Sequence, residues 1–236
     1  MKDSQQLKVQ EQPPAREGSQ RLSIARLKTW ESLGFGMFLH FGMSTFDGLE
    51  LSPGTTPIDH YQPHELDVDQ WLSIARDVGM RYAVLTVKHV SGFCLWPSRF
   101  TDYHVGNSPV AMDVVEAFIE GCQKRGLMAG LYYCSWDNRH RFGSLTPGDL
   151  SDHPDDETMK HAWVSKAYME FQHNQLDELL RAYGPVGEVW IDIPGVLPRF
   201  YRQDLYNHIA CLQPEAVIMM NNGLGLTNQL KVWHTW

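Results

Sequence analysis

The stretch Tyr82-Ala-Val-Leu-Thr-Val-Lys-His89 is an almost unbroken apolar run that ends in two polar residues. Such a run, without polar alternation, is typical of a strand covered on both faces in a parallel sheet. Outward from it, further strands are predicted at residues 34–40, 127–133, 188–192 and 216–220. Apolar residues at helical spacing predict helices at residues 68–78, 112–125, 158–183 and 205–212. Strands that alternate with amphipathic helices define an α/β protein with a parallel sheet.

Each predicted strand is followed by polar or aromatic residues that could bind a ligand or take part in catalysis. These are His40, His89, Trp136-Asp137, Asp192 and Asn221-Asn222. In a (β/α) barrel such strand ends meet at one mouth, where active sites lie. A nucleotide-binding open sheet is less favoured, because no GxGxxG follows the first strand and no phosphate-binding GxxxxGK motif is present. We therefore predict a (β/α) TIM-like barrel.

The length of 236 residues does not fit a whole barrel at this strand spacing. The strand starts recur about every 46 residues, and eight such units need roughly 370 residues. We therefore expect a truncated or incomplete barrel of about five β/α units at residues 26–236, with its C-terminal part missing, after a flexible arm at residues 1–25. An open barrel exposes strand edges and apolar faces, so we expect a second copy to cover them in a homo-oligomer.

The charge balance limits the partners. The chain has 20 Lys and Arg against 28 Asp and Glu, a net charge of −8, which argues against nucleic acid or an anionic membrane as a partner. No run reaches the ~18 apolar residues of a membrane-spanning helix. No signal-peptide pattern opens the chain, so a cytoplasmic location is expected unless a signal was removed. The four cysteines show no zinc-binding spacing, and no metal or other cofactor is expected.

Asp192 is the first candidate for a functional residue. It ends an apolar strand and precedes a Pro-Gly turn, and a carboxylate in such a place must accept hydrogen bonds, bind metal or do chemistry. His40 and His89 end two successive strands and could bind a hydroxylated ligand, ligate metal or move protons. Trp136 and Trp190 could form an apolar wall for a small ring. A metallohydrolase using His40, His89 and Asp192 is the less favoured alternative, since the HxH pair of comparable barrel enzymes is absent.

Five colinear segments resemble the α-L-fucosidases of glycoside hydrolase family 29. They are Phe35-Gly-Met-Phe-Leu-His-Phe-Gly42 with Ser44-Thr-Phe46, Tyr82 to His89, Gly92-Phe-Cys-Leu-Trp-Pro-Ser98 with Thr101-Asp102-Tyr103, Asp113-Val-Val115 with Gly130-Leu-Tyr-Tyr-Cys-Ser-Trp-Asp137, and Glu188-Val-Trp-Ile-Asp192. The match covers about two thirds of the chain. The resemblance implies a retaining exo-glycosidase on an irregular (β/α) barrel that hydrolyses terminal α-L-fucose.

The resemblance also implies roles for single residues. Asp192 matches the nucleophile of the family, which forms a covalent glycosyl-enzyme. His40 and His89 match histidines that bind the sugar, and Trp190 matches the tryptophan two residues before the nucleophile. Glu50 is the weakly supported candidate for the acid/base, because the family's own acid/base lies late in the sequence.

The sequence departs from the family at three places. Val90 replaces the second histidine of a Lys-His-His motif, Ile193-Pro194 replaces the glycine after the nucleophile, and Asn221-Asn222-Gly223 lacks the usual arginine. A non-catalytic, sugar-binding remnant of the barrel without a general acid therefore stands as the alternative to the glycosidase.

Overall fold

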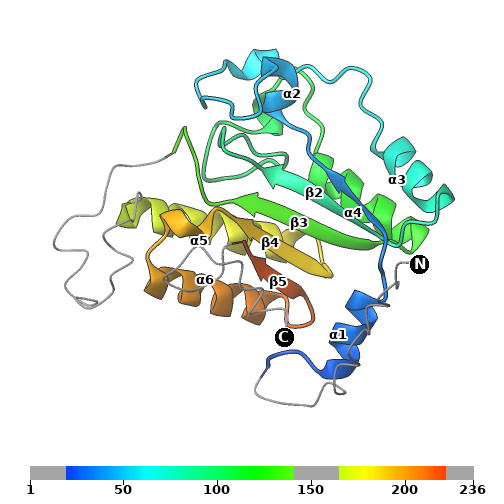
Figure 1. The fold of residues 1–236 in the computed structure, drawn as a ribbon. Coiled ribbons are helices and arrows are strands. Elements are labelled where there is room, and N and C mark those ends of the chain that lie inside the picture. The colour runs from blue at the N-terminus through cyan, green and yellow to red at the C-terminus, as the bar shows by residue number, and fades with distance from the viewer. Residues whose placement is uncertain (1–19, 141–164, 222–236) are drawn as a thin grey trace, which may run out of the picture.

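The computed structural model describes residues 20–140 and 165–221. At its centre is a five-stranded parallel sheet in which each strand pairs with the next one in the sequence (Figure 1). The strands are β1 Gly36–Leu39, β2 Tyr82–Lys88, β3 Met128–Cys134, β4 Glu188–Asp192 and β5 Val217–Met220. A sequential parallel order is that of a (β/α) barrel, and the five predicted strands are confirmed.

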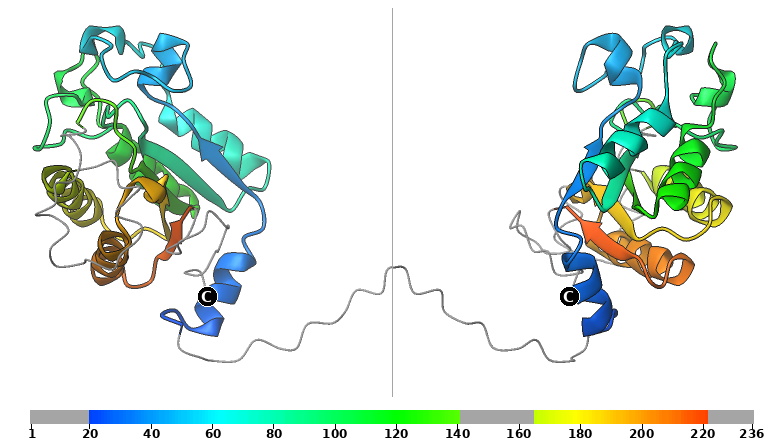
Figure 2. Two further views of the ribbon diagram at one scale, coloured as in Figure 1. Left: turned by 60° about the vertical axis from the view of Figure 1, so that its left-hand side comes forward. Right: turned by 90° about the vertical axis from the view of Figure 1, so that its right-hand side faces the viewer.

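The larger helices α3 to α6 lie together on one face of this sheet (Figure 2). The helices are α1 Ile24–Glu31, α2 Met43–Asp47, α3 Val68–Asp77, α4 Val114–Arg125, α5 Lys166–Ala182 and α6 Arg199–Leu212, with single turns at Ile58–His60, Val105–Asn107 and Pro194–Val196. None of the described helices is long and apolar enough to cross a membrane.

Side-chain caps fix where the helices begin. Asp67, Asp113 and Ser165 each accept a hydrogen bond from a backbone N–H in the first turn of α3, α4 and α5. Gly126, at φ +64°, ends α4 in the left-handed conformation that glycine adopts without strain. The predicted helix at residues 158–183 is observed from Lys166 onward, and its first part lies outside the described residues.

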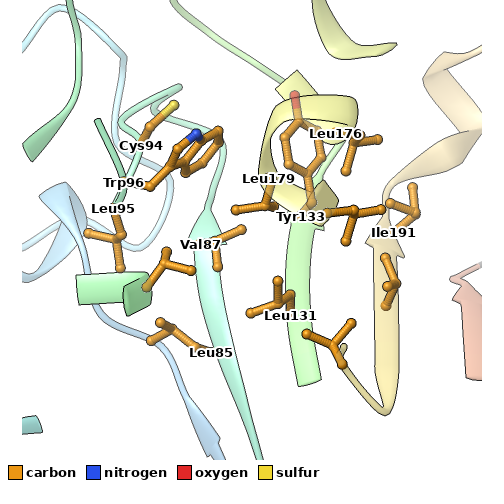
Figure 3. Close-up of a cluster of buried hydrophobic side chains, with 14 of the residues drawn as sticks. Leu85, Val87, Cys94, Leu95, Trp96, Leu131, Tyr133, Leu176, Leu179 and Ile191 are labelled. Atoms are coloured by element: carbon orange, nitrogen blue, oxygen red, sulfur yellow. The ribbon is translucent and has the colours of Figure 1, made fainter. Parts of the chain in front are cut away.

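The side chains of the strands divide between two faces. Leu85, Val87, Leu131, Tyr133 and Ile191 pack in the main core against the helices (Figure 3). Val84, Val90, Tyr132 and Cys134 form a smaller cluster on the opposite face, which we call the inner face because it lines the interior of a barrel. The candidate site residues of the strand ends, His89 and Trp190 among them, contact this inner face.

The segment before β1 closes the N-terminal end of β4 and β5. The guanidinium of Arg21 donates hydrogen bonds to the carbonyls of Pro214 and Ala216, and Leu22 is buried. Trp30 on α1 donates from Nε1 to the buried carboxyl of Glu188, 3.1 Å away. Residues 20–25 therefore belong to the folded domain, although the sequence predicts them as part of the arm; residues 1–19 lie outside the described residues.

A register shift at the end of β2 reverses the side-chain alternation. Thr86 pairs with Tyr132, but Lys88 pairs with Tyr133, so one residue of β2 is extra. Val87 and Lys88 consequently both face the helices, where the Lys88 ammonium lies 4.3 Å from the Tyr133 ring centroid. Such a bulge re-aims the residues that follow it. His89 is thereby turned to the inner face.

Lys88 forms a buried ion pair with Asp137. Its Nζ lies 2.7 Å from Oδ2 of Asp137, and both side chains are 0% exposed. Burial alone lowers the pKa of Lys88, but the facing carboxylate outweighs this effect and raises the pKa overall. Burial likewise opposes ionisation of Asp137, yet Lys88 and His140 hold its pKa well below the usual value. Both groups are therefore charged in the folded chain.

Asp137→Asn is expected to destabilise the chain by about 3–5 kcal/mol, because it leaves the Lys88 ammonium buried without its counter-charge. The double variant Lys88→Met/Asp137→Asn is expected to recover much of this loss, since no charge is then buried. Urea unfolding of both variants, with the exposed Asp59→Asn as control, measures the difference. A double variant as unstable as the single one would contradict the expectation.

Candidate active site

The carboxylate of Asp192 is held from both neighbouring strands. The Tyr132 hydroxyl, from β3, donates to Oδ2, and the Asn221 amide, directly after β5, donates to Oδ1 at 2.5 Å. The Asp192 backbone carbonyl accepts the N–H of Ser135 at 2.9 Å. Hydrogen bonds to both carboxylate oxygens fix the plane of the group.

The two predicted histidines lie beside each other at the ends of β1 and β2. The ring centroids of His40 and His89 are 4.4 Å apart, and the ring planes meet at 65°. Burial, assisted by the neighbouring His40, lowers the pKa of His89 to about 4, although the charge of Asp192 acts in the opposite direction. His89 is therefore neutral near pH 7. Its Nδ1 atom is buried and has no hydrogen-bond partner among the described residues.

An aromatic wall lies next to these polar groups. Trp190 lies 6.1 Å from Tyr132 between ring centroids, and the edge of Phe38 contacts both, at 5.4 Å from Trp190 and 5.6 Å from Tyr132. Phe38 is 47% exposed, so the wall faces open space on the inner face. Nε1 of Trp190 is buried without a hydrogen-bond partner within the described chain. Apolar walls with a few unpaired polar atoms are typical of small-ligand pockets.

Trp136 packs at the mouth against the same inner-face cluster as Trp190. Its Nε1 donates to Oδ1 of Asn138 at 2.7 Å, and Asn138 in turn donates to the carbonyl of Ser52 at 2.9 Å. The loops after β1 and β3 are thereby joined. Both predicted tryptophans thus lie along one apolar wall.

Glu50 makes no contact with this group through a hydrogen bond or ion pair among the described residues. It is exposed in the loop after α2, and among the described residues no hydrogen bond or ion pair joins it to another side chain. Its neighbour Asp47, by contrast, accepts hydrogen bonds from Ser52 and Thr56. The acid/base role of Glu50 stays a prediction.

Sequence analysis assigned no role to Tyr132, Asn221 or Phe38. Inner-face spacing could have found two of them, because Tyr132 lies two residues before Cys134, the strand partner of Asp192, and Phe38 lies two residues before His40. Asn221 was noted as a strand end, but its bond to Asp192 requires the pairing of β4 with β5. Pair registers, which a single sequence does not show, are the missing information.

The backbone directly after Asp192 is in an unusual conformation. Ile193, at φ 47° and ψ 44°, is the one non-glycine residue with positive φ in the described chain. A β-branched residue adopts the left-handed conformation at a cost of roughly 1–2 kcal/mol. This is the position where the resemblance leads one to expect glycine, so the strand end keeps a glycine-like turn in spite of the side chain.

The metallohydrolase alternative lacks a ligand set within residues 20–140 and 165–221. No group of three or more His, Cys, Asp and Glu side chains there could hold a metal ion. His40, His89 and Asp192 lie near one another, but Asp192 is engaged by Tyr132 and Asn221 instead.

The sequential parallel strands define the TIM-barrel class, and their ends bring together an oriented carboxylate, paired histidines and an aromatic wall, as in small-ligand pockets. The family model described as alpha-L-fucosidase matches residues 55–231, about three quarters of the chain. The chain therefore belongs to the alpha-L-fucosidase family.

Individual proteins of known name or structure are similar to this chain. Alpha-L-fucosidase 1 of Arabidopsis thaliana is 35% identical over 201 residues, which are 82% of this chain and 36% of that protein. A glycoside hydrolase 29 family member from an unknown rumen bacterium is 29% identical with a TM-score of 0.68, over 82% of this chain and 35% of that one. Alpha-L-fucosidase isoenzyme 1 from Paenibacillus thiaminolyticus is 27% identical with a TM-score of 0.67, over 82% and 49% of the two chains. The chain thus spans about a third to a half of these relatives.

The free energy of unfolding is expected to fall as the pH is lowered from about 6.5 to about 4. His89 stays neutral in the folded chain over this range, whereas in the unfolded chain it binds a proton near its ordinary pKa of 6.5. The unfolded state therefore takes up the extra proton, and acid favours it. His89→Gln removes this term, so urea unfolding at several pH values is expected to show a shallower acid slope than in the wild-type chain.

The exposed His64→Gln is the matched control and is expected to leave the slope unchanged. An acid slope that is the same in His89→Gln and in the wild-type chain would contradict the burial of a neutral His89.

Proposed function

We propose that this chain carries the nucleophile side of a retaining α-L-fucosidase site, with Asp192 as the nucleophile. The observation that carries the proposal is the Asp192 carboxylate, hydrogen-bonded by Tyr132 and Asn221 on the inner face beside the His40–His89 pair. The family membership supports fucosides as the substrate class. The chain spans 36% of the Arabidopsis relative, so fucoside hydrolysis by this chain is proposed and does not follow from the family alone.

In the first step an oxygen of ionised Asp192 attacks the anomeric carbon of the fucoside. The glycosidic bond breaks, the leaving oxygen takes a proton from the acid, and a covalent glycosyl-enzyme forms. Water, deprotonated by the same acid/base, then cleaves this ester-like bond and releases fucose with retained configuration. The Tyr132 and Asn221 bonds hold one oxygen each and so orient the carboxylate for the attack.

Sugar recognition is proposed for the groups around the nucleophile. The neutral His89, with its unpaired Nδ1, and Trp190, with its unpaired Nε1, are suited to sugar hydroxyls, because a ligand lacking those hydroxyls leaves the buried atoms unsatisfied. His40 contributes its ring beside His89. The aromatic wall of Phe38, Tyr132 and Trp190, with Trp136 at the mouth, suits the methyl group and apolar face of a 6-deoxy sugar.

A retaining mechanism needs a second carboxyl about 5–5.5 Å from the nucleophile. Glu50 is the proposed candidate within this chain. The alternative function, a sugar-binding barrel remnant without a general acid, is favoured by one observation: Glu50 is exposed and makes no hydrogen bond or ion pair within the described residues.

Asp192→Gly is expected to abolish hydrolysis of an aryl α-L-fucoside with a good leaving group, by several kcal/mol of barrier and on the order of 1000-fold or more. Added azide should restore turnover and yield the fucosyl azide of inverted configuration, because azide occupies the space of the lost carboxylate. Steady-state kinetics and product analysis by NMR measure both effects, with the exposed Asp59→Gly as control.

Unchanged hydrolysis by Asp192→Gly would exclude Asp192 as the nucleophile. Binding of L-fucose without any turnover by the wild-type chain would favour the sugar-binding alternative.

We also propose that a second copy covers the open side of the barrel next to β1. Phe35 is 54% exposed, and Ile74 and Val78 on the adjacent α3 segment are 50% and 56% exposed. The carbonyl of Phe35 accepts the N–H of Arg81, just after α3, so these side chains border one edge. Like apolar patches on two copies can bury each other around a two-fold axis.

Light scattering is therefore expected to give a dimer or larger oligomer. Ile74→Glu/Val78→Glu is expected to weaken it at least about tenfold, because charges are then buried in an apolar contact. The exposed Arg76→Ala on the same helix serves as control. A stable monomer at all concentrations would refute the proposed contact.

A further inference from the structure

A second hollow lies among the loops that follow β1, β2 and β3. It has a volume of about 390 Å³ and is lined by Thr55, Ile58, Asp102, Asn107 and Arg139, among others. All three loops leave the carboxyl ends of their strands, the same side of the sheet as Asp192. None of the candidate active-site residues lines this hollow, so it is a separate site on the same mouth.

Arg139 is held rigidly at its wall. Nη1 donates to the carbonyl of Gly54 at 3.0 Å, and the guanidinium carbon lies 4.1 Å from the Tyr103 ring centroid. Tyr103 is buried, and its hydroxyl donates to the carbonyl of Thr56 at 2.9 Å. Gly54 is at φ +76°, and a Cβ there would lie 2.8 Å from the backbone nitrogen of Arg139. The close approach of the two loops thus requires glycine, and Arg139 loses little freedom when it binds a ligand.

Donors and acceptors remain available around the hollow. Within the described chain, Nε and Nη2 of Arg139 make no recorded hydrogen bond, and the carboxylate of Asp102 accepts none. The Asn107 amide nitrogen donates to the Asp102 carbonyl at 3.0 Å, which leaves the amide oxygen as an acceptor. A guanidinium, a carboxylate and an amide oxygen are therefore displayed together, with Ile58 as an apolar neighbour.

This set of groups selects a chemical class of ligand. The charges of Arg139 and Asp102 cancel, so neither an anion nor a cation is favoured over a neutral ligand. Paired donors and acceptors match adjacent hydroxyl groups, which both donate and accept. The volume lies within the usual range for small-ligand sites.

We propose that this hollow binds a neutral sugar residue on the leaving-group side of a fucosylated oligosaccharide. The inference rests on the proposed fucosidase function. Arg139 follows Cys134, the strand partner of Asp192, by five residues, so their Cα atoms are at most about 19 Å apart. Within that distance the further sugars of an oligosaccharide with its fucose at Asp192 can reach Arg139, and the hollow would then select what fucose is attached to.

The test measures binding to the full chain by isothermal titration calorimetry or saturation-transfer NMR, with L-fucose, lactose and fucosyllactose as probes. Asp192→Asn is used as the background so that nothing is hydrolysed during the titration. Arg139→Ala in this background is expected to weaken fucosyllactose and lactose about tenfold or more, because each loses hydrogen bonds to a charged group, while L-fucose binds as before. Asp102→Asn, which keeps size and exposure, is expected to act in the same direction, and Arg76→Ala is expected to change nothing.

Equal weakening of L-fucose and fucosyllactose would overturn the proposal, since Arg139 would then act through the fucose site or the fold. Unchanged binding of fucosyllactose and lactose in both variants would also overturn it, as would tighter retention of sialylated or sulfated than of neutral sugars. If L-fucose fails to bind at all, the proposed function fails, yet weaker lactose binding by Arg139→Ala would still support the hollow as a sugar site. Thermal unfolding of each variant shows whether the fold is intact.

Discussion

The arrangement of the mouth depends on one extra residue in β2 and on the buried ion pair that accompanies it. Regular alternation would place Lys88 on the inner face and His89 toward the helices. The bulge places Lys88 among the aromatic rings of Tyr133, Tyr168 and Phe171 instead, where its charge is tolerable only because Asp137 lies 2.7 Å away. His89 can then face His40 and Asp192. A feature of the outer core thus determines the composition of the inner site.

The same ion pair organises the loop after β3. Asp137 also accepts backbone N–H bonds from Arg139 and His140, at 3.0 and 2.7 Å, so its carboxylate closes the turn that begins at the end of the strand. Trp136 lies just before this turn, beside the candidate active site, and Arg139 lies just after it, beside the second hollow. The two sites are therefore positioned by one turn, and a change in the ion pair acts on both.

The sequence predicts the strands and helices well because the buried faces of both produce local patterns of apolar residues. The proximity of Asp192, His40 and His89 was predictable because parallel strand ends meet at one edge, a constraint that needs no contact information; their roles stay a prediction. The bulge at Lys88 was not predictable, since regular alternation from Tyr82 assigns Lys88 and His89 to the wrong faces. Tyr132 and Asn221 were missed because their role follows from pair registers between strands that are far apart in the sequence. The folding of residues 20–25 was missed because it depends on Arg21 bonds to the segment before β5.

The carboxyl groups in the loops after the strands differ in the contacts that they make. Asp137 forms an ion pair with Lys88 on the side of the sheet that faces the helices. It therefore cannot protonate a leaving group near Asp192. One carboxylate oxygen of Asp47 already accepts hydrogen bonds from the hydroxyls of Ser52 and Thr56. Asp102, after β2, lines the second hollow, and Glu50 is one of several exposed carboxyls in the loop after β1 that make no hydrogen bond or ion pair among the described residues. A general acid must be able to hold a proton near neutral pH, which requires burial or a nearby negative charge. Glu50 is exposed in the described chain, and the proposed second copy is a surface that could bury it. The proposed acid and the proposed contact between copies are linked for this reason.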